Sequence, residues 1–184
     1  GMAQDGLLSF EPAFVDELAV MMRFAFDYMQ RGNKDSAAVE PDEKKWLRDE
    51  TGGSVYLRLS TRPLEQPSRT MTPDLMGDIV SGGYWMRQPG PSTRLIIAYT
   101  GVMAPEAIEA VGLMGEDSRE IGLLSVTSAD RLNAGWTAAQ RGRERGDGEA
   151  LSHVEALLER LPQDCVLVTV CDAHPATLGW LGSV

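Results

Sequence analysis

Residues that follow apolar, strand-like segments are the best candidates for chemistry in this sequence. Asp172 and His174 come directly after one such segment, and Thr100 and Thr127 follow two others. Because ligands collect outside the carboxyl ends of parallel strands, these four side chains are predicted to lie together at an edge of the sheet where a ligand could bind. A carboxylate beside a histidine favours its charged form, which suits holding an anionic substrate or relaying a proton. In the competing interpretation, Asp172 and Thr127 only satisfy backbone donors at loop and helix starts.

Familiar catalytic and binding motifs are absent. The sequence has no Gly-x-Gly-x-x-Gly after a strand, no phosphate loop ending in Gly-Lys-Ser/Thr, and no Gly-x-Ser-x-Gly elbow. Its two histidines, His153 and His174, are far apart in the chain and support neither a zinc site nor a hydrolase triad. We therefore assign no catalytic, cofactor-binding or metal-binding residue.

The two cysteines indicate packing and not redox chemistry. Cys165 and Cys171 enclose a run of β-formers, and their even separation places both sulfurs on one face of a strand. At the strand rise they would lie roughly 20 Å apart, too far for a disulfide or a shared metal. Buried strand cysteines in a reducing compartment are the simpler interpretation, so we expect a cytoplasmic protein.

Composition excludes several classes of partner. The 184 residues are 43% hydrophobic and 24% charged, which is typical of a globular protein. A net charge of −10 repels phosphate backbones and anionic membranes, so neither nucleic acid nor a membrane surface is an expected partner. No stretch approaches the roughly 18 consecutive apolar residues needed to cross a bilayer.

The elements that would position the candidate residues form a regular pattern. Continuous apolar runs of strand length alternate with helical segments, which predicts an α/β fold with a mainly parallel sheet covered by helices on both faces. The predicted strands are Leu95–Tyr99, Ile121–Val126 and Val166–Val170, and the predicted helices are Pro105–Met114 and His153–Leu161.

The first part of the chain predicts one long helix and one strand. The helix is expected over Pro12–Arg31, with Glu11 as its cap and apolar residues on much of its circumference. Such a wide apolar face predicts exposed hydrophobic surface and a two-fold dimer. The alternating segment Ser54–Thr61 predicts a strand. The polar segment 33–53 between them predicts a loop with one helical turn near 43–47.

Several segments resemble single-chain pyruvate dehydrogenases, the homodimeric, thiamine-diphosphate-dependent decarboxylating components. Glu11–Val20 resembles a late helix of their pyrimidine-binding domain, and Val55–Leu59 is similar to the strand that closes that domain. Leu95–Val102 with Pro105-Glu106-Ala107 looks like the first strand and helix of their C-terminal domain. The most specific match is Leu124–Leu132, and Val168–Asp172 resembles the third strand of transketolase-like proteins in general.

The resemblance implies a C-terminal fragment of a larger enzyme with a transketolase C-terminal-domain-like fold. Residues 1–69 would be the tail of the pyrimidine-binding domain, 70–91 a linker with a short helix, and 92–184 the C-terminal-like domain, truncated at its end. The parent would be an acetyl-transferring pyruvate dehydrogenase, an oxidoreductase that uses thiamine diphosphate and magnesium and partners an acyltransferase subunit. The fragment would serve dimer assembly and substrate access, bind no cofactor, and be inactive alone. By the same resemblance, the edge that carries Asp172, His174, Thr127 and Thr100 would lie near the substrate channel of the parent.

Two observations limit this resemblance. Gly146-Asp147-Gly148 mimics the diphosphate-binding triplet of thiamine enzymes, but it lies in a charged loop and no asparagine follows Asn133 to complete the motif. The segment Arg62–Pro67 also replaces an Asn-Glu-Asn-Tyr-His-like stretch of the pyruvate type. A transketolase, another 2-oxoacid dehydrogenase, or a non-catalytic stand-alone binding module with the same fold therefore stay open as alternatives.

Overall fold

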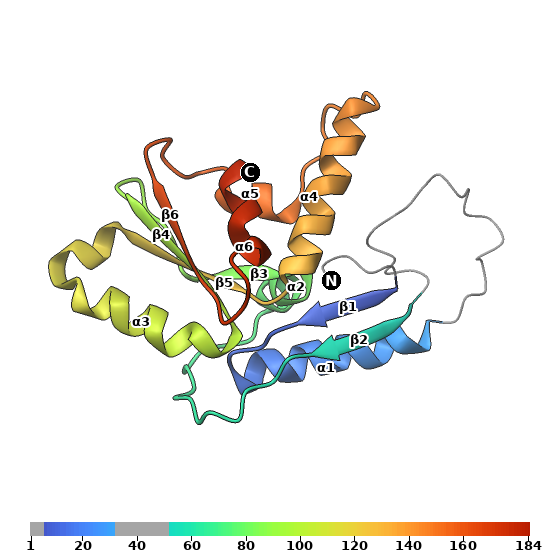
Figure 1. Ribbon diagram of the computed structural model, residues 1–184, viewed down its shortest axis with the longest axis horizontal. Coiled ribbons are helices and arrows are strands. Elements are labelled where there is room, and N and C mark those ends of the chain that lie inside the picture. The colour runs from blue at the N-terminus through green and yellow to red at the C-terminus, as the bar shows by residue number, and fades with distance from the viewer. Residues whose placement is uncertain (1–5, 32–51) are drawn as a thin grey trace.

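The computed structural model describes residues 6–31 and 52–184. One parallel pair of strands, β1–β2, lies beside a four-stranded sheet with the order β3-β5-β4-β6 (Figure 1). In the larger sheet β4, β5 and β6 are parallel, and β3 runs antiparallel to β5. The strands are β1 (Leu7–Phe10), β2 (Ser54–Leu57), β3 (Gly83–Arg87), β4 (Leu95–Thr100), β5 (Ile121–Val126) and β6 (Val166–Val170). The predicted α/β class and the three neighbouring parallel strands are confirmed.

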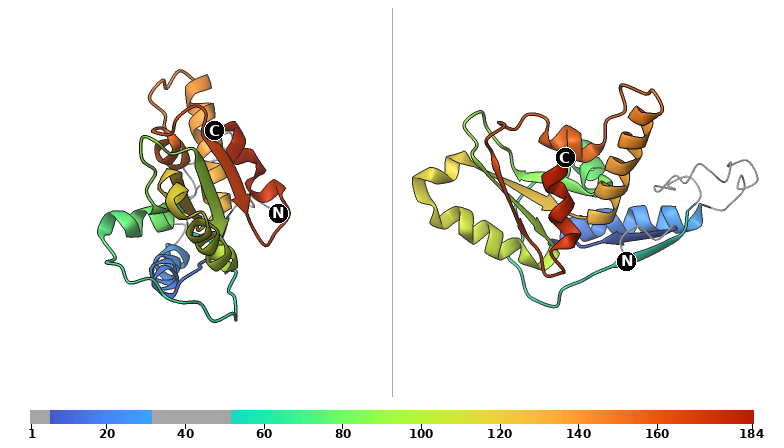
Figure 2. Two further views of the ribbon diagram at one scale, coloured as in Figure 1. Left: turned by 90° about the vertical axis from the view of Figure 1, so that its left-hand side faces the viewer. Right: turned by 45° about the horizontal axis from the view of Figure 1, so that its top comes forward.

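Helices cover both faces of the larger sheet, as Figures 1 and 2 show. Ile97 and Tyr99 of β4 pack against α3, whereas Ile96 and Ala98 pack against α4, α5 and α6. Both faces of the larger sheet are therefore buried away from solvent at its centre, which is why β4 and β5 are apolar at almost every position. The helices are α3 (Ala104–Leu113), α4 (Ala129–Glu144), α5 (His153–Leu158) and α6 (Ala176–Gly179), with short 3-10 helices η2 (Gly101–Met103), η3 (Gly115–Glu120) and η4 (Trp180–Ser183).

The smaller sheet and α1 (Val15–Gln30) form a second layer of the molecule. Leu8 and Phe10 of β1 pack against Met21 and Tyr28 of α1 in a buried cluster. The same cluster includes side chains from α2 (Pro73–Ser81) and from β3. The two layers therefore share one continuous hydrophobic contact.

The start of α1 corrects one prediction. The helix begins at Val15 and not at Pro12, and Glu11 does not cap it. Instead the Glu17 carboxylate accepts hydrogen bonds from the backbone N–H groups of Ala13 and Phe14, at 2.7 and 3.2 Å. A carboxylate in the first helical turn satisfies donors that the helix itself leaves free, so this position fixes where α1 starts.

Residues 70–91, predicted as a linker, contain α2 and β3, and β3 pairs with β5. The predicted short helix is present as α2, which Thr72 caps by accepting from the Leu75 N–H. Gly82 has a φ of 113°, a left-handed conformation that lets the chain turn directly from α2 into β3. The segment is rich in Gly, Pro and Ser, which predicts a linker. The β-forming residues Tyr84-Trp85-Met86 directly after the turn are too few to outweigh that composition.

Two further expectations differ in detail. The sequence predicts a buried third strand, but β6 is an edge strand whose Val166 and Val168 side chains are exposed. Its flanking cysteines are consequently half-buried and free. The strand predicted over Ser54–Thr61 ends at Leu57, because its partner β1 has only four residues.

The part of the chain that the structure describes contains no helix of the length and apolarity needed to span a membrane. The helical turn predicted near 43–47 lies outside the described residues.

Candidate functional site where the strand ends meet

Carboxyl ends of strands from both sheets converge on one edge of the molecule. Glu11, which follows β1, donates its backbone N–H to the carbonyl of Thr127, which follows β5, at 2.8 Å. The Ser128 hydroxyl donates to the carbonyl of Ser9 in β1 at 2.5 Å. These bonds fix the end of the small sheet against the carboxyl edge of the large one, where an open α/β sheet commonly binds ligands.

A hollow of about 270 Å³ lies at this edge. Arg58, directly after β2, lies between two carboxylates: Nη2 is 2.8 Å from Asp172 Oδ2, and Nη1 is 3.4 Å from Glu11 Oε2. Its side chain is 36% exposed, so the guanidinium remains open to solvent and to an anion. The hollow is lined by Glu11, Arg58, Leu59, Ser60, Thr61, Gly101, Val102 and Asp172.

The Glu11 carboxylate is the most perturbed group in the hollow. Burial raises its pKa, and the Arg58 guanidinium and the nearby Thr100 hydroxyl oppose that rise. Gly101 makes the approach of Glu11 possible, because its φ is +41° and an added Cβ would lie only 3.3 Å from the Glu11 Cβ. The hollow therefore holds a partly buried carboxylate, Glu11, beside a solvent-accessible guanidinium, Arg58.

The structure brings together only two of the four predicted site residues. Asp172 lines the hollow, and Thr100 is buried beside Glu11. The hydroxyl of Thr127 instead donates to the carbonyl of Ile79 at 2.7 Å, inside the protein. The exposed His174 ring accepts a hydrogen bond from the Ala176 N–H at 3.2 Å through Nδ1. Asp172 pairs with Arg58, while His174 caps the start of α6.

Sequence reasoning missed the two remaining charged residues of the hollow. The sequence pattern predicts a helix cap at Glu11 and an alternating strand position at Arg58, and neither pattern indicates a binding site. Arg58 lies 47 residues from Glu11 and 114 from Asp172 in the chain, so no local pattern connects them. The one sequence feature that Glu11 and Arg58 share with Asp172 is their position directly after a strand.

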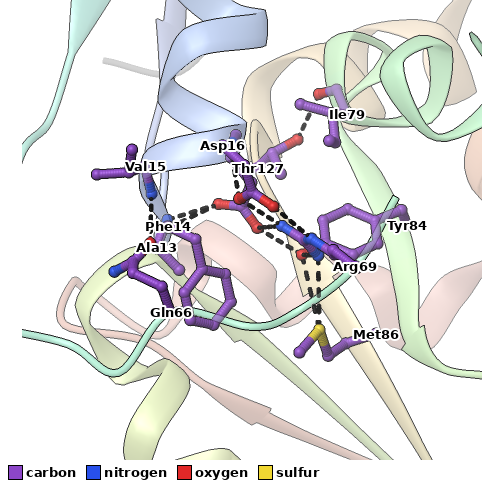
Figure 3. A network of polar contacts seen from close by, with 11 residues as sticks. Ala13, Phe14, Val15, Asp16, Gln66, Arg69, Ile79, Tyr84, Met86 and Thr127 are labelled. Atoms are coloured by element: carbon purple, nitrogen blue, oxygen red, sulfur yellow. Dashed lines mark hydrogen bonds and ion pairs between the residues drawn. The ribbon is translucent and has the colours of Figure 1, made fainter. Parts of the chain in front are cut away.

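A second polar cluster is buried between the two layers (Figure 3). Arg69 contacts Asp16 through Nε and Nη2 at 2.7 and 2.8 Å, and it donates to the Tyr84 hydroxyl from Nη1 at 2.5 Å. The Tyr84 hydroxyl in turn donates to Glu17 Oε1 at 2.5 Å. Arg69 also lies over the rings of Phe14 and Tyr84.

The charges in this cluster compensate one another. Burial raises the pKa of Glu17 and, with the charge of Glu17, that of Tyr84, whose hydroxyl stays protonated and donates. Burial also opposes ionisation of Asp16, but its bonds to Arg69 outweigh that effect and lower its pKa. The cluster joins α1 to β3, so its evident role is to hold the layers together.

No group of three or more His, Cys, Asp or Glu side chains within 6–31 and 52–184 is arranged to hold a metal ion. We therefore derive no chemical step through thiamine diphosphate or magnesium on these residues.

Comparison of the fold with solved structures adds the decisive observation. A mutant transketolase from Pichia stipitis superimposes with a TM-score of 0.54 at 16% sequence identity, over 90% of this chain. The chain has the fold of part of a transketolase. A second mutant of that enzyme, and a third in complex with fructose-6-phosphate, each match 95% of the chain with a TM-score of 0.56 and 16% identity.

The match covers only a piece of those proteins. The chain spans 18–19% of the length of these transketolase chains. No protein family model and no curated protein sequence matches it.

Proposed function

We propose that this chain is the C-terminal part of a thiamine-diphosphate-dependent 2-oxoacid dehydrogenase decarboxylating component of the single-chain pyruvate dehydrogenase kind. The transketolase-like fold supports the superfamily, and the segment Leu124–Leu132 supports the pyruvate type. In this proposal β1, α1 and β2 close the pyrimidine-binding domain, and residues 92–184, joined by α2 and β3, form the C-terminal domain.

The observation that carries the proposal is the convergence of strand ends around Arg58. The hollow there combines an accessible guanidinium with two carboxylates, and the buried Thr100 hydroxyl lies beside one of them, Glu11. In the parent enzyme this edge shapes substrate access, and Arg58 attracts the anionic substrate. Asp172 and Glu11 hold the guanidinium in place without catalysing a step.

The chain is further proposed to act as a part of a homodimer in the cytoplasm. The acyltransferase subunit of a 2-oxoacid dehydrogenase complex is the proposed partner of the parent. Thiamine diphosphate and magnesium belong to the parent, and we expect this chain alone neither to bind them tightly nor to decarboxylate pyruvate. Gly146-Asp147-Gly148 is followed by no asparagine that would complete a diphosphate-binding motif, which supports that expectation.

The test compares this chain with the longer natural polypeptide. Calorimetry with thiamine diphosphate and magnesium should show binding only for the longer protein, and pyruvate should reduce an artificial electron acceptor only in its presence. Arg58→Gln should raise the KM for pyruvate, whereas the exposed control Arg94→Gln should not. Magnesium-dependent binding of the cofactor to this chain alone contradicts the proposal.

The solved structures favour one second candidate, the transfer of ketol groups between sugar phosphates. The matching proteins are transketolases, and one was solved with fructose-6-phosphate. An assay of the longer polypeptide with pyruvate and with sugar phosphates separates the two reactions. If the natural polypeptide contains no thiamine-binding sequence, both enzymatic candidates fail, and a non-catalytic binding module is the function that remains.

A further inference from the structure

A second hollow lies where the extended segment after β2 passes α3. Its volume is about 570 Å³, which is larger than the hollow at Arg58 and within the range of small-molecule sites. Residues 65–68 and the first turns of α3 line it, together with Phe14 and Met86. Figure 3 shows the side chains of Phe14 and Met86 beside the extended segment. This α3 hollow shares no lining residue with the hollow at Arg58, among the residues that the structure describes.

Polar contacts hold the extended segment in place beside the α3 hollow. The Gln66 side chain accepts a hydrogen bond from the Val15 N–H through Oε1 at 2.8 Å. Three residues later, Arg69 is held by two hydrogen bonds to Asp16. The hollow is therefore formed before a ligand enters, which reduces the ordering that binding would otherwise require.

Most side chains that line the α3 hollow are apolar. They come from four separate segments of the chain and therefore surround a ligand from several directions. Contact with these surfaces removes apolar area from water, and the Met86 thioether also favours an aromatic ring as its neighbour. These apolar lining residues are Phe14, Pro67, Met86, Pro105 and Ile108.

Two carboxylates give the α3 hollow a charge preference. Glu65 on the extended segment and Glu109 on α3 both line it, whereas no described lysine or arginine does. Within residues 6–31 and 52–184 neither carboxylate has an ion-pair partner, although Glu106, one turn earlier on α3, pairs with Arg62. A positively charged ligand would compensate both carboxylates, whereas an anion would be repelled.

We propose that the α3 hollow binds a small organic cation, an amine whose apolar body is an aromatic ring. The ring contacts the apolar lining, and the ammonium group lies near Glu65 and Glu109. A 2-oxo acid suits the guanidinium of Arg58 and not this hollow, so the two hollows have opposite charge preferences. The inference goes beyond the proposed function and does not rest on it.

Tryptamine is the probe for the first experiment, because it joins an aromatic body to one ammonium group. Titration of the isotope-labelled chain, followed by NMR, should show saturable binding with shifts at the backbone amides of Ser68, Ile108 and Glu109. A dissociation constant of about 1 mM is expected for a ligand of this size. Tryptophol, in which a hydroxyl replaces the ammonium, should bind at least about fivefold more weakly, and indole-3-propionate should not bind.

Substitutions separate the charged from the apolar contribution. Glu65→Gln combined with Glu109→Gln should weaken tryptamine binding about tenfold and leave tryptophol binding unchanged. The matched control is Glu149→Gln combined with Glu159→Gln, which changes the net charge equally at exposed positions outside the hollow. Ile108→Ser, at a position that is 40% exposed, should weaken the binding of both ligands.

Several outcomes overturn the proposal. Equal affinities for tryptamine and tryptophol, shifts that never saturate, or equal effects of the two double substitutions each contradict it. A lysine-rich peptide that binds the hollow where tryptamine does not would identify a protein partner as the occupant instead. All these measurements use this chain without thiamine diphosphate or pyruvate, so the proposed enzyme can fail while the amine site stands.

Discussion

Burial separates the charged residues of this protein into two kinds. Arg58 and Asp172 form an ion pair in which the carboxylate side chain is 63% exposed, and such pairs contribute at most about 1 kcal/mol. Glu17 is completely buried and accepts bonds from two backbone groups and one hydroxyl. The exposed ion pair is therefore accessible to a ligand, whereas the contacts of Glu17 lie inside the protein and stabilise the fold.

Glu17→Ala should lower the free energy of unfolding by about 3 kcal/mol, because it leaves buried donors of Ala13, Phe14 and Tyr84 without an acceptor. Urea titration followed by circular dichroism measures the loss. Asp27→Ala, at an exposed position of the same helix, is the control and should change stability by less than about 0.5 kcal/mol. A loss below about 1 kcal/mol for Glu17→Ala would show that the cluster is not stabilising.

His174→Ala should leave kcat/KM of the longer enzyme within about twofold of the wild type, since the exposed ring only caps α6. Arg58→Gln in the same enzyme should lower kcat/KM by about tenfold, the loss expected for one charge contact with an anionic substrate. Steady-state kinetics with pyruvate measure both variants. Equal effects of the two substitutions would contradict the different roles that their positions indicate.

Among the secondary-structure elements, those with a strong local signal were predicted best. β4 and β5 are buried on both faces, so almost every residue in them is apolar, and the two runs can be recognised from the sequence alone. β1 has only four residues and β3 lies among glycines and prolines, so neither has a pattern long enough to detect. Both strands are held by pairing with distant segments.

In the candidate site, too, the features that follow from local sequence were predicted, and those that depend on distant contacts were not. The carboxyl edge was predicted because it follows from parallel strands, and Asp172 and Thr100 lie there. The partner of Asp172 was not predicted, because Arg58 reaches it from a different sheet. The position of one layer relative to the other depends on contacts such as Glu11 N–H to Thr127, which carry no sequence signature.

The capping box of α5 makes part of the stability depend on pH. Burial opposes ionisation of Glu155, but its bonds to Arg143 and Ser152 outweigh that effect and lower its pKa to about 2. A carboxyl group whose pKa is lower in the folded state stabilises above its unfolded pKa of 4.5. This contribution is lost as pH falls from there towards about 2.

Glu155→Gln should therefore destabilise the protein at neutral pH by about 1 kcal/mol and by almost nothing near pH 2. Thermal unfolding of wild type and variant across this range measures the difference. Glu144→Gln, at an exposed position of α4, should show no such convergence. A Glu155→Gln penalty that stays constant down to pH 2 would rule out the lowered pKa as its cause.

In the whole molecule, the two layers meet across a largely apolar contact that contains one buried charged cluster. Arg69 links Asp16 and Glu17 of α1 to Tyr84 of β3, and its side chain is only 15% exposed. An apolar contact alone would allow the two layers to shift relative to each other. The two hydrogen bonds from Arg69 to Asp16 are directional and fix one relative position of the layers. The cluster therefore fixes the position of the α1 layer relative to the larger sheet.

Arg69→Met should lower the free energy of unfolding by about 3 kcal/mol, because two carboxylates lose the cation that compensates their burial. The loss should not be uniform. Backbone amides of β1 and β2 should exchange with solvent faster, while those of β4 and β5 stay protected, because the variant loosens the layer contact before the large sheet opens. Hydrogen exchange measures this difference, and Arg94→Met, whose side chain is 77% exposed, is the control. If Arg69→Met accelerates exchange equally in both sheets, the two layers form one cooperative unit and the cluster does not govern their attachment.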